Sequence, residues 1–302
     1  MPTVRDIVNK DKCLYHYTSE NGILGMFKDK NFTLQLSRAN SLNDKTEGKD
    51  LFICLEEVCK KMLNGKQISQ TLYNNIISIY SGNLSDAAEQ TLQSKSTILR
   101  RRNKLSDTTT DTFIMSFSKK PDCLPMWNYY THAGTQGYSI QISTNKLLNC
   151  IKKFYSDNDI FFNNIDFCNV IYKNEEKEEL LETAINEIDD EKNINKFIKK
   201  LNDYQYIFKH ESFEYEEEVR LIIKIPKNST TQNKLLNFRT RNGIIVPFIQ
   251  LDLGKIPNNT VSEIMIGPLS NDAVANENLR MFLEFNGHSN INIRNSDIPI
   301  RF

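Results

Sequence analysis

Residues 211–225, which read Glu-Ser-Phe-Glu-Tyr-Glu-Glu-Glu-Val-Arg-Leu-Ile-Ile-Lys-Ile, decide how the rest of the chain is interpreted. Five of the first eight residues are glutamates, and an apolar strand follows them. Alternation puts four apolar residues on one face of that strand, namely Val219, Leu221, Ile223 and Ile225. Arg220 and Lys224 fall on the other face. Because carboxylates at the mouth of a buried strand can be held rigidly, paired or desolvated, a catalytic or cation-binding acid is expected here.

The composition predicts a soluble protein with a sizeable core. The 302 residues are 39% hydrophobic and 10% aromatic, which suits one large domain with helical insertions. The 38 basic and 38 acidic residues cancel, so no global field favours nucleic acid or an anionic membrane. Six cysteines without a Cys-x-x-Cys pair favour reduced thiols in a cytoplasm. No segment approaches the about 20 apolar residues that cross a bilayer.

Alternating and helical apolar patterns predict an α+β fold with a mixed, mainly antiparallel sheet. Strands are expected at 13–18, 32–37, 113–118, 138–142, 166–172, 219–225, 243–249, 261–267 and 291–294. Helical segments are expected as an insertion over about 50–105, as a second segment over about 175–205, and at 271–285, with Ser19 capping a further short helix. No linker or repeat divides the chain, so residues 1–302 are interpreted as a single domain.

Polar residues at strand ends are the candidates for a site, and each has a structural alternative. His16 ends the first strand, where a lone histidine is often a satisfied, half-buried side chain. Ser116 and Ser118 end the strand 113–118. The aromatic residues Trp127 and Tyr130 follow it, and they could line a pocket for a flat ring or fill the core of a short helix.

The loop after strand 32–37 carries Asn43, Asp44 and Glu47, which could form a turn and cap the next helix. Familiar motifs are absent, including Gly-x-x-x-x-Gly-Lys-Ser/Thr, Gly-x-Gly-x-x-Gly and His-Glu-x-x-His. With four histidines, a His-rich metal site is not expected. A carboxylate site for magnesium or manganese would draw on Asp44, Glu47, Glu216 and Glu218, but spacing alone gives no reason to expect a metal.

Several blocks in order along nearly the whole chain resemble the bacterial family DUF2971, a domain of unknown function. They are residues 14–19 (Leu-Tyr-His-Tyr-Thr-Ser), 42–47 (Leu-Asn-Asp-Lys-Thr-Glu), 115–118 (Met-Ser-Phe-Ser), 126–130 (Met-Trp-Asn-Tyr-Tyr), 170–172 (Val-Ile-Tyr), 215–220 (Tyr-Glu-Glu-Glu-Val-Arg) and 296–301 (Ser-Asp-Ile-Pro-Ile-Arg). Lys45 stands where the family usually has proline, and Phe213 where tryptophan is common.

A second resemblance bears on function. The histidine of Tyr-His-Tyr-Thr, the strand ending Ser-Phe-Ser and the late Glu-x-Glu-Val are similar to the three core motifs of ADP-ribosyltransferases. The resemblance implies ADP-ribosyltransferase-like central sheets and NAD as substrate. It assigns the catalytic set to Glu218, Glu216 and His16. It assigns nucleotide binding to His16, Tyr17, Thr18, Arg38, Asn43, Asp44, Glu47, Ser116, Ser118, Trp127, Tyr130 and Arg220.

The chemistry implied by that resemblance is physically sensible. Cleavage of the nicotinamide–ribose bond develops positive charge on the ribose, which a fixed Glu218 carboxylate stabilises. Ser116 would orient Glu218, and Arg38 would pair with the pyrophosphate. Alternatively, Arg220 would neutralise Glu216 or Glu218.

Two other functions stay open at this point. One is a nucleotide-sensing or protein-binding module of a bacterial toxin or antiphage defence system, without turnover. The other is a metal-dependent phosphodiesterase or nuclease. The balanced charge favours neither nucleic acid nor protein as the acceptor of an ADP-ribosyl group, and no membrane partner is expected.

Overall fold

A computed structural model of the chain describes residues 13–41, 49–81, 110–130, 136–158, 164–188, 191–241, 243–268 and 273–299. The fold is α+β. Its sheet is mixed and mostly antiparallel: in the described residues, β10 and β11 pair in parallel, and the other paired strands run antiparallel. The predicted α+β class with a mixed, mainly antiparallel sheet is therefore confirmed. The chain forms two compact units. Unit 1 comprises Met1–Leu42, Thr110–Asn169 and Tyr215–Phe302, and unit 2 comprises Asn43–Thr109 and Val170–Glu214.

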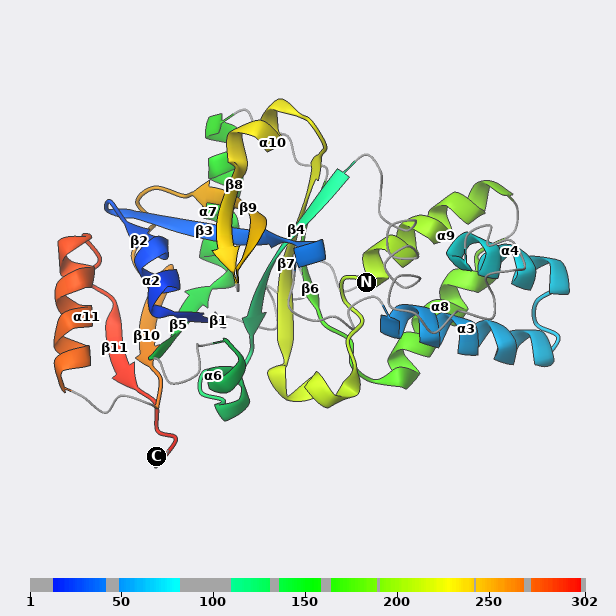
Figure 1. Ribbon diagram of the computed structural model, residues 1–302, viewed down its shortest axis with the longest axis horizontal. Helices are drawn as coiled ribbons and strands as arrows, with labels where there is room; N and C mark the ends of the chain where they lie inside the picture. Colours follow the sequence, from blue (N-terminus) through cyan, green and yellow to red (C-terminus); the bar gives the residue numbers. More distant parts are fainter. Residues whose placement is uncertain are drawn as a thin grey trace. The chain divides into compact units, whose positions relative to one another are not determined.

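Unit 1 contains an 11-stranded sheet (Figure 1). Its strands are β1 (Cys13–Ser19), β2 (Phe27–Lys28), β3 (Asn31–Arg38), β4 (Thr110–Ser118), β5 (Gly137–Ser143), β6 (Asn164–Asn169), β7 (Glu218–Pro226), β8 (Leu236–Arg241), β9 (Ile244–Asp252), β10 (Val261–Ile266) and β11 (Asn292–Asn295). Their spatial order is β11-β10-β5-β1-β4-β3-β9-β8. Off this path, β2 pairs with β3, and β7 pairs with β4 and β6.

The two faces of this sheet differ in chemistry. One face, called here the core face, carries buried apolar side chains of which Leu34, Phe117 and Val219 are examples. Helices α2 (Glu20–Met26), α7 (Thr144–Asn158) and α11 (Ala273–Phe285) add their buried leucine, isoleucine and methionine side chains to this core. The opposite face, called here the site face, carries Ser118 and Glu218 as register partners. The hydrophobic effect therefore fixes which side chains of β4 and β7 remain for polar chemistry.

Shorter elements complete unit 1. They are η1 (Ala39–Ser41), α6 (Leu124–Tyr130), η3 (Glu211–Glu216), which crosses the boundary of the unit, and α10 (Thr230–Leu235). Ser19 caps α2 as predicted, because its hydroxyl accepts a hydrogen bond from the backbone N–H of Gly22 at 3.4 Å. Tyr17, Met126, Trp127 and Met265 form a smaller buried cluster around α6.

Unit 2 is helical in the described residues. Its helices are α3 (Lys49–Asn64), α4 (Gln70–Ser81), α8 (Asn174–Asn186) and α9 (Glu191–Tyr204). The first two account for the described part of the predicted insertion over 50–105, and residues 82–109 lie outside the described residues. The predicted helical segment over 175–205 consists of two helices rather than one. The sequence Asp189-Asp190 between them consists of residues that favour helix starts over helix interiors.

In the described part of the chain, no helix is both long enough and apolar enough to span a membrane. All six cysteines are free thiols.

Candidate functional site

Strand β4 is the centre of the candidate site because it touches three other strands. Its whole length pairs with β7, from Thr110 opposite Pro226 to Ser118 opposite Glu218. On its other edge it pairs with β3 at residues 113–114 and with β1 at Ser118. Between these two pairings, residues 115–117 of β4 are paired with neither β1 nor β3 on this edge. We call this stretch of β4 the seam.

His16 of β1 lies at the seam. Its Nδ1 is 2.9 Å from the backbone oxygen of Ser116. A carbonyl oxygen only accepts hydrogen bonds, so Nδ1 carries the proton and Nε2 keeps its lone pair. Burial lowers the pKa of His16 to about 4, and the positive charge of Arg239 acts in the same direction, whereas the hydrogen bond to Ser116 opposes the shift. His16 is therefore a neutral acceptor at physiological pH.

His16 and Glu218 do not point to the same face of the sheet. The His16 ring lies beside Phe117 on the core face, with ring centroids 5.8 Å apart. Glu218 is the register partner of Ser118, which places both on the site face together with Ser116. The structure thus brings the three predicted motifs onto neighbouring strands, β1, β4 and β7, while separating the histidine from the glutamate by the thickness of the sheet.

Glu218 forms a bidentate ion pair with Arg220. The Arg220 Nε donates to Glu218 Oε1 at 2.8 Å, and Nη2 donates to Oε2 at 3.0 Å. Both side chains are 2% exposed. They lie two residues apart on β7, so alternation holds them side by side on one face. The guanidinium of a pair this buried cancels much of the charge of the carboxylate.

The Glu216 side chain does not follow the alternation of side chains along β7. β7 begins at Glu218, and Glu217 has a positive φ of 41°, which ends the extended backbone. The Ser118 hydroxyl donates to the Glu216 backbone oxygen at 2.6 Å and fixes this turn. The buried Glu216 carboxylate accepts a hydrogen bond from the Tyr130 hydroxyl at 3.3 Å. The turn therefore links η3, β4 and α6.

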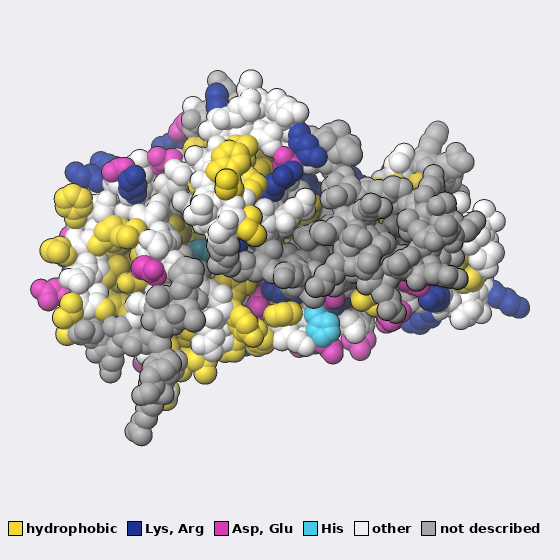
Figure 2. Space-filling model, in the orientation of Figure 1, with side chains coloured by type: hydrophobic (Ala, Val, Ile, Leu, Met, Phe, Trp, Pro, Cys, Tyr) yellow, Lys and Arg dark blue, Asp and Glu magenta, His cyan; other side chains and the backbone are white. Residues whose placement is uncertain are grey.

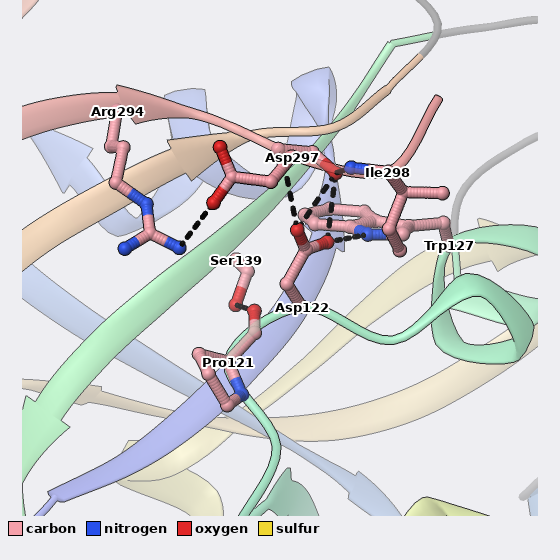
Figure 3. A network of polar contacts seen from close by, with 8 residues as sticks. Pro121, Asp122, Trp127, Ser139, Arg294, Asp297 and Ile298 are labelled. Atoms are coloured by element: carbon pink, nitrogen blue, oxygen red, sulfur yellow. Dashed lines mark hydrogen bonds and ion pairs between the residues drawn. The ribbon is translucent and has the colours of Figure 1, made fainter. Parts of the chain in front are cut away.

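Trp127 is part of a structural network (Figure 3). Its indole Nε1 donates to Asp122 Oδ1 at 2.7 Å, and the same carboxylate accepts from the backbone N–H of Asp297 at 2.9 Å. Trp127 is 3% exposed, packs edge-on against Tyr17, and lies so close to Gly267 that a methyl group there would be 3.0 Å from the indole. Its ring faces are therefore taken by protein atoms, which agrees with the alternative of a core tryptophan.

The remaining predicted site residues lie in different surroundings. Arg38 pairs with Asp111 through an Nη2 to Oδ1 contact of 2.6 Å, and Asp111 also accepts from Gln232. The Tyr17 hydroxyl donates to the backbone oxygen of Lys120 at 3.0 Å. Thr18 is half-buried against Gly22. The predicted loop residues Asn43, Asp44 and Glu47 lie outside the described residues.

Two arginines that the sequence interpretation left out lie close to the seam. Arg239 on β8 donates from Nη1 to Gln35 at 2.8 Å and from Nη2 to Ser37 at 2.7 Å, both on β3. Arg241 lies two residues further along the same face of β8. The dipeptide Asn242-Gly243 between two alternating segments was the signal that would have predicted the β8–β9 hairpin.

A cavity of about 350 Å³ lies elsewhere in unit 1, and its lining includes Lys30, Lys255 and His288 but none of the predicted site residues. The described residues contain no group of three or more His, Cys, Asp or Glu side chains that could hold a metal ion.

The architecture therefore defines an α+β protein whose candidate site lies where two strands part along β4. The family described as "Protein of unknown function (DUF2971)" matches residues 126–221, a segment that runs from α6 into β7 and includes Glu216, Glu218 and Arg220. The predicted resemblance to DUF2971 is thereby confirmed over these residues. Neither the curated proteins nor the solved structures contain a match to the chain.

Proposed function

We propose that this protein is an ADP-ribosyltransferase-like protein that binds NAD at the seam and cleaves the nicotinamide–ribose bond. The observation that carries the proposal is the adjacency of β1, β4 and β7. These strands hold the three motifs that resemble the superfamily, with His16 bonded to Ser116 and Ser118 opposite Glu218. In sequence, His16 lies 100 residues before Ser116, and Ser118 lies 100 residues before Glu218, so the meeting of the motifs on neighbouring strands supports a common site.

The proposal assigns a role to each residue. Neutral His16 offers Nε2 as an acceptor for a ribose hydroxyl. Glu218 supplies the negative charge that stabilises the positive charge developing on the ribose. Arg220 positions the Glu218 carboxylate, and this pair must open for the carboxylate to act at full charge. Tyr130 on α6 is held by its hydrogen bond to Glu216, two residues before Glu218.

A second candidate function is favoured by the same ion pair. Glu218 is buried and satisfied by Arg220, and it lies on the face opposite His16. A protein that binds a nucleotide without cleaving it would need no free carboxylate. Nucleotide binding without turnover therefore stands as the alternative, and turnover separates the two.

The experiment measures NAD binding by calorimetry and nicotinamide release by chromatography, with and without cell extract as acceptor. The test variant is Glu218→Gln. Glu217→Gln is the matched control, because Glu217 is an adjacent glutamate that is exposed and pairs only with Lys120 among the described residues. Circular dichroism and a thermal melt check that each variant folds.

Release by the wild type and by Glu217→Gln, with a loss of at least 100-fold in folded Glu218→Gln, would support NAD cleavage. Binding without release in all three proteins would overturn cleavage in favour of the non-catalytic alternative. Absence of both binding and release would reject NAD as the ligand.

A further inference from the structure

We propose that Arg239 and Arg241 form a binding site for the diphosphate group of a nucleotide, next to the seam. The proposal rests on the proposed function only for the nucleotide part of the ligand. The anion site itself follows from the placement and charge of the two arginines, neither of which belongs to a motif of the sequence interpretation.

The two guanidinium groups share one face of β8. Arg239 is opposite Val246 and Arg241 opposite Ile244 on β9, and residues two apart on a strand point the same way. The Arg239 guanidinium lies over the Phe248 ring, 5.2 Å from its centroid, and reaches across β9 to the polar side chains of β3. These contacts orient the guanidinium, and among the described residues its other N–H groups have no hydrogen-bond acceptor.

The positive charges of this pair are not compensated by a carboxylate among the described residues. Arg239 bonds to an amide and a hydroxyl, both neutral, and no hydrogen bond or ion pair holds Arg241 within the described chain. Burial lowers the pKa of Arg239, and the neighbouring Arg241 lowers it further. Burial also lowers the pKa of Arg241, and the nearby Tyr130 opposes that shift. Burying each of these charges costs free energy, and the two like charges also repel each other. A bound anion would reduce both the cost of burial and the repulsion.

Arg38, unlike Arg239 and Arg241, has a carboxylate partner. Its guanidinium donates Nε and Nη2 to Asp111, so its charge is already neutralised. The pyrophosphate role that the sequence resemblance assigned to Arg38 is therefore better filled by Arg239 and Arg241. Guanidinium groups bind phosphate oxygens in a bidentate geometry, which suits a diphosphate spanning two arginines.

The arginine pair also lies next to β3, one of the strands that border the seam, because Arg239 bonds to its residues Gln35 and Ser37. The positive charge of Arg239 lowers the pKa of His16, and Tyr130 raises the pKa of Arg241. Figure 2 shows lysine and arginine side chains beside the hydrophobic side chains that cover the β8 region, where Phe238, Ile244 and Ile245 are more than 60% exposed.

The experiment measures the affinity of the full chain for ADP by calorimetry, with adenosine and a short single-stranded oligonucleotide as comparison ligands. Arg241→Gln is the main variant because Arg241 holds no side chain of the described chain in place. Arg239→Gln is the second, with its folding checked because it loses the bonds to Gln35 and Ser37. Arg294→Gln is the matched control, since Arg294 is an exposed arginine of unit 1 in a long 3.6 Å ion pair with Asp297.

The wild type and Arg294→Gln are expected to bind ADP, adenosine is expected to bind weakly, and Arg241→Gln is expected to lose about tenfold to hundredfold in ADP affinity. Equal ADP affinity in Arg241→Gln and the wild type would overturn the proposal. Oligonucleotide binding that ADP does not displace would assign the arginines to a nucleic-acid backbone and would also overturn it. Arg241-dependent ADP binding without nicotinamide release would retain the anion site while rejecting NAD cleavage.

Discussion

At the scale of single residues, the stability of the fold is expected to depend strongly on the buried Glu218–Arg220 ion pair. Removing one charge leaves the other without its partner in a dry environment. Arg220→Met is expected to lower the free energy of unfolding by about 3–5 kcal/mol, because the Glu218 carboxylate loses a bidentate donor. The double variant Glu218→Leu with Arg220→Met removes both charges, and it is expected to recover most of that loss.

Urea unfolding of the two variants and the wild type measures this difference, with the slope checked for two-state behaviour. If the double variant were as unstable as Arg220→Met alone, the cost would lie in lost packing volume rather than in an unpaired charge.

His16 gives a pH-dependent prediction with a defined sign. Its pKa falls from 6.5 to about 4 on folding, so the unfolded chain binds the proton more tightly. The contribution of His16 to stability is therefore complete above pH 6.5 and is lost as the pH falls from 6.5 towards 4. His16→Gln is expected to flatten the stability profile in that window. Thermal melts of both proteins at pH 7 and pH 5 provide the measurement, and identical pH dependence in the two proteins would contradict the assignment.

At the scale of elements, the sequence predicts best where one face of a strand is apolar. β1, β3, β4, β5, β7 and β10 coincide with predicted strands because alternation buries one side of each in the core. β8 was not predicted, since its residues are half-buried or exposed and carry little apolar periodicity. The arginine pair was missed with it, although Asn242-Gly243 marked a hairpin.

The polar partners within the candidate site depend on tertiary structure. Nothing near Arg38 in sequence indicates that it pairs with Asp111, which is 73 residues away. The positive φ of Glu217 also interrupts the alternation that placed Glu216 beside Glu218. The sequence therefore predicted which strands would carry polar groups, but the contacts of those groups depend on register and on one strained turn.

At the scale of the whole molecule, each compact unit has its own core. The buried apolar cluster of the sheet draws only on residues of unit 1. In unit 2, α3 contributes Leu55 and α8 contributes Leu181, both 0% exposed. Lys61 on α3 pairs with Glu178 and Glu182 on α8, but these exposed ion pairs contribute little compared with the burial of the two leucines.

Because the cores are separate, a cavity in one is expected to destabilise that unit selectively. Leu55→Ala should cost about 2–5 kcal/mol in unit 2, and Leu221→Ala on β7 should cost a similar amount in unit 1. Hydrogen exchange followed by mass spectrometry reads out each unit by its own peptides. Leu55→Ala is expected to speed exchange in α3 and α8 while β4 and β7 keep their protection, and Leu221→Ala is expected to do the reverse. Faster exchange throughout the chain in both variants would mean that the two units unfold as one cooperative body, since a loss in either core would then be shared by all the backbone hydrogen bonds.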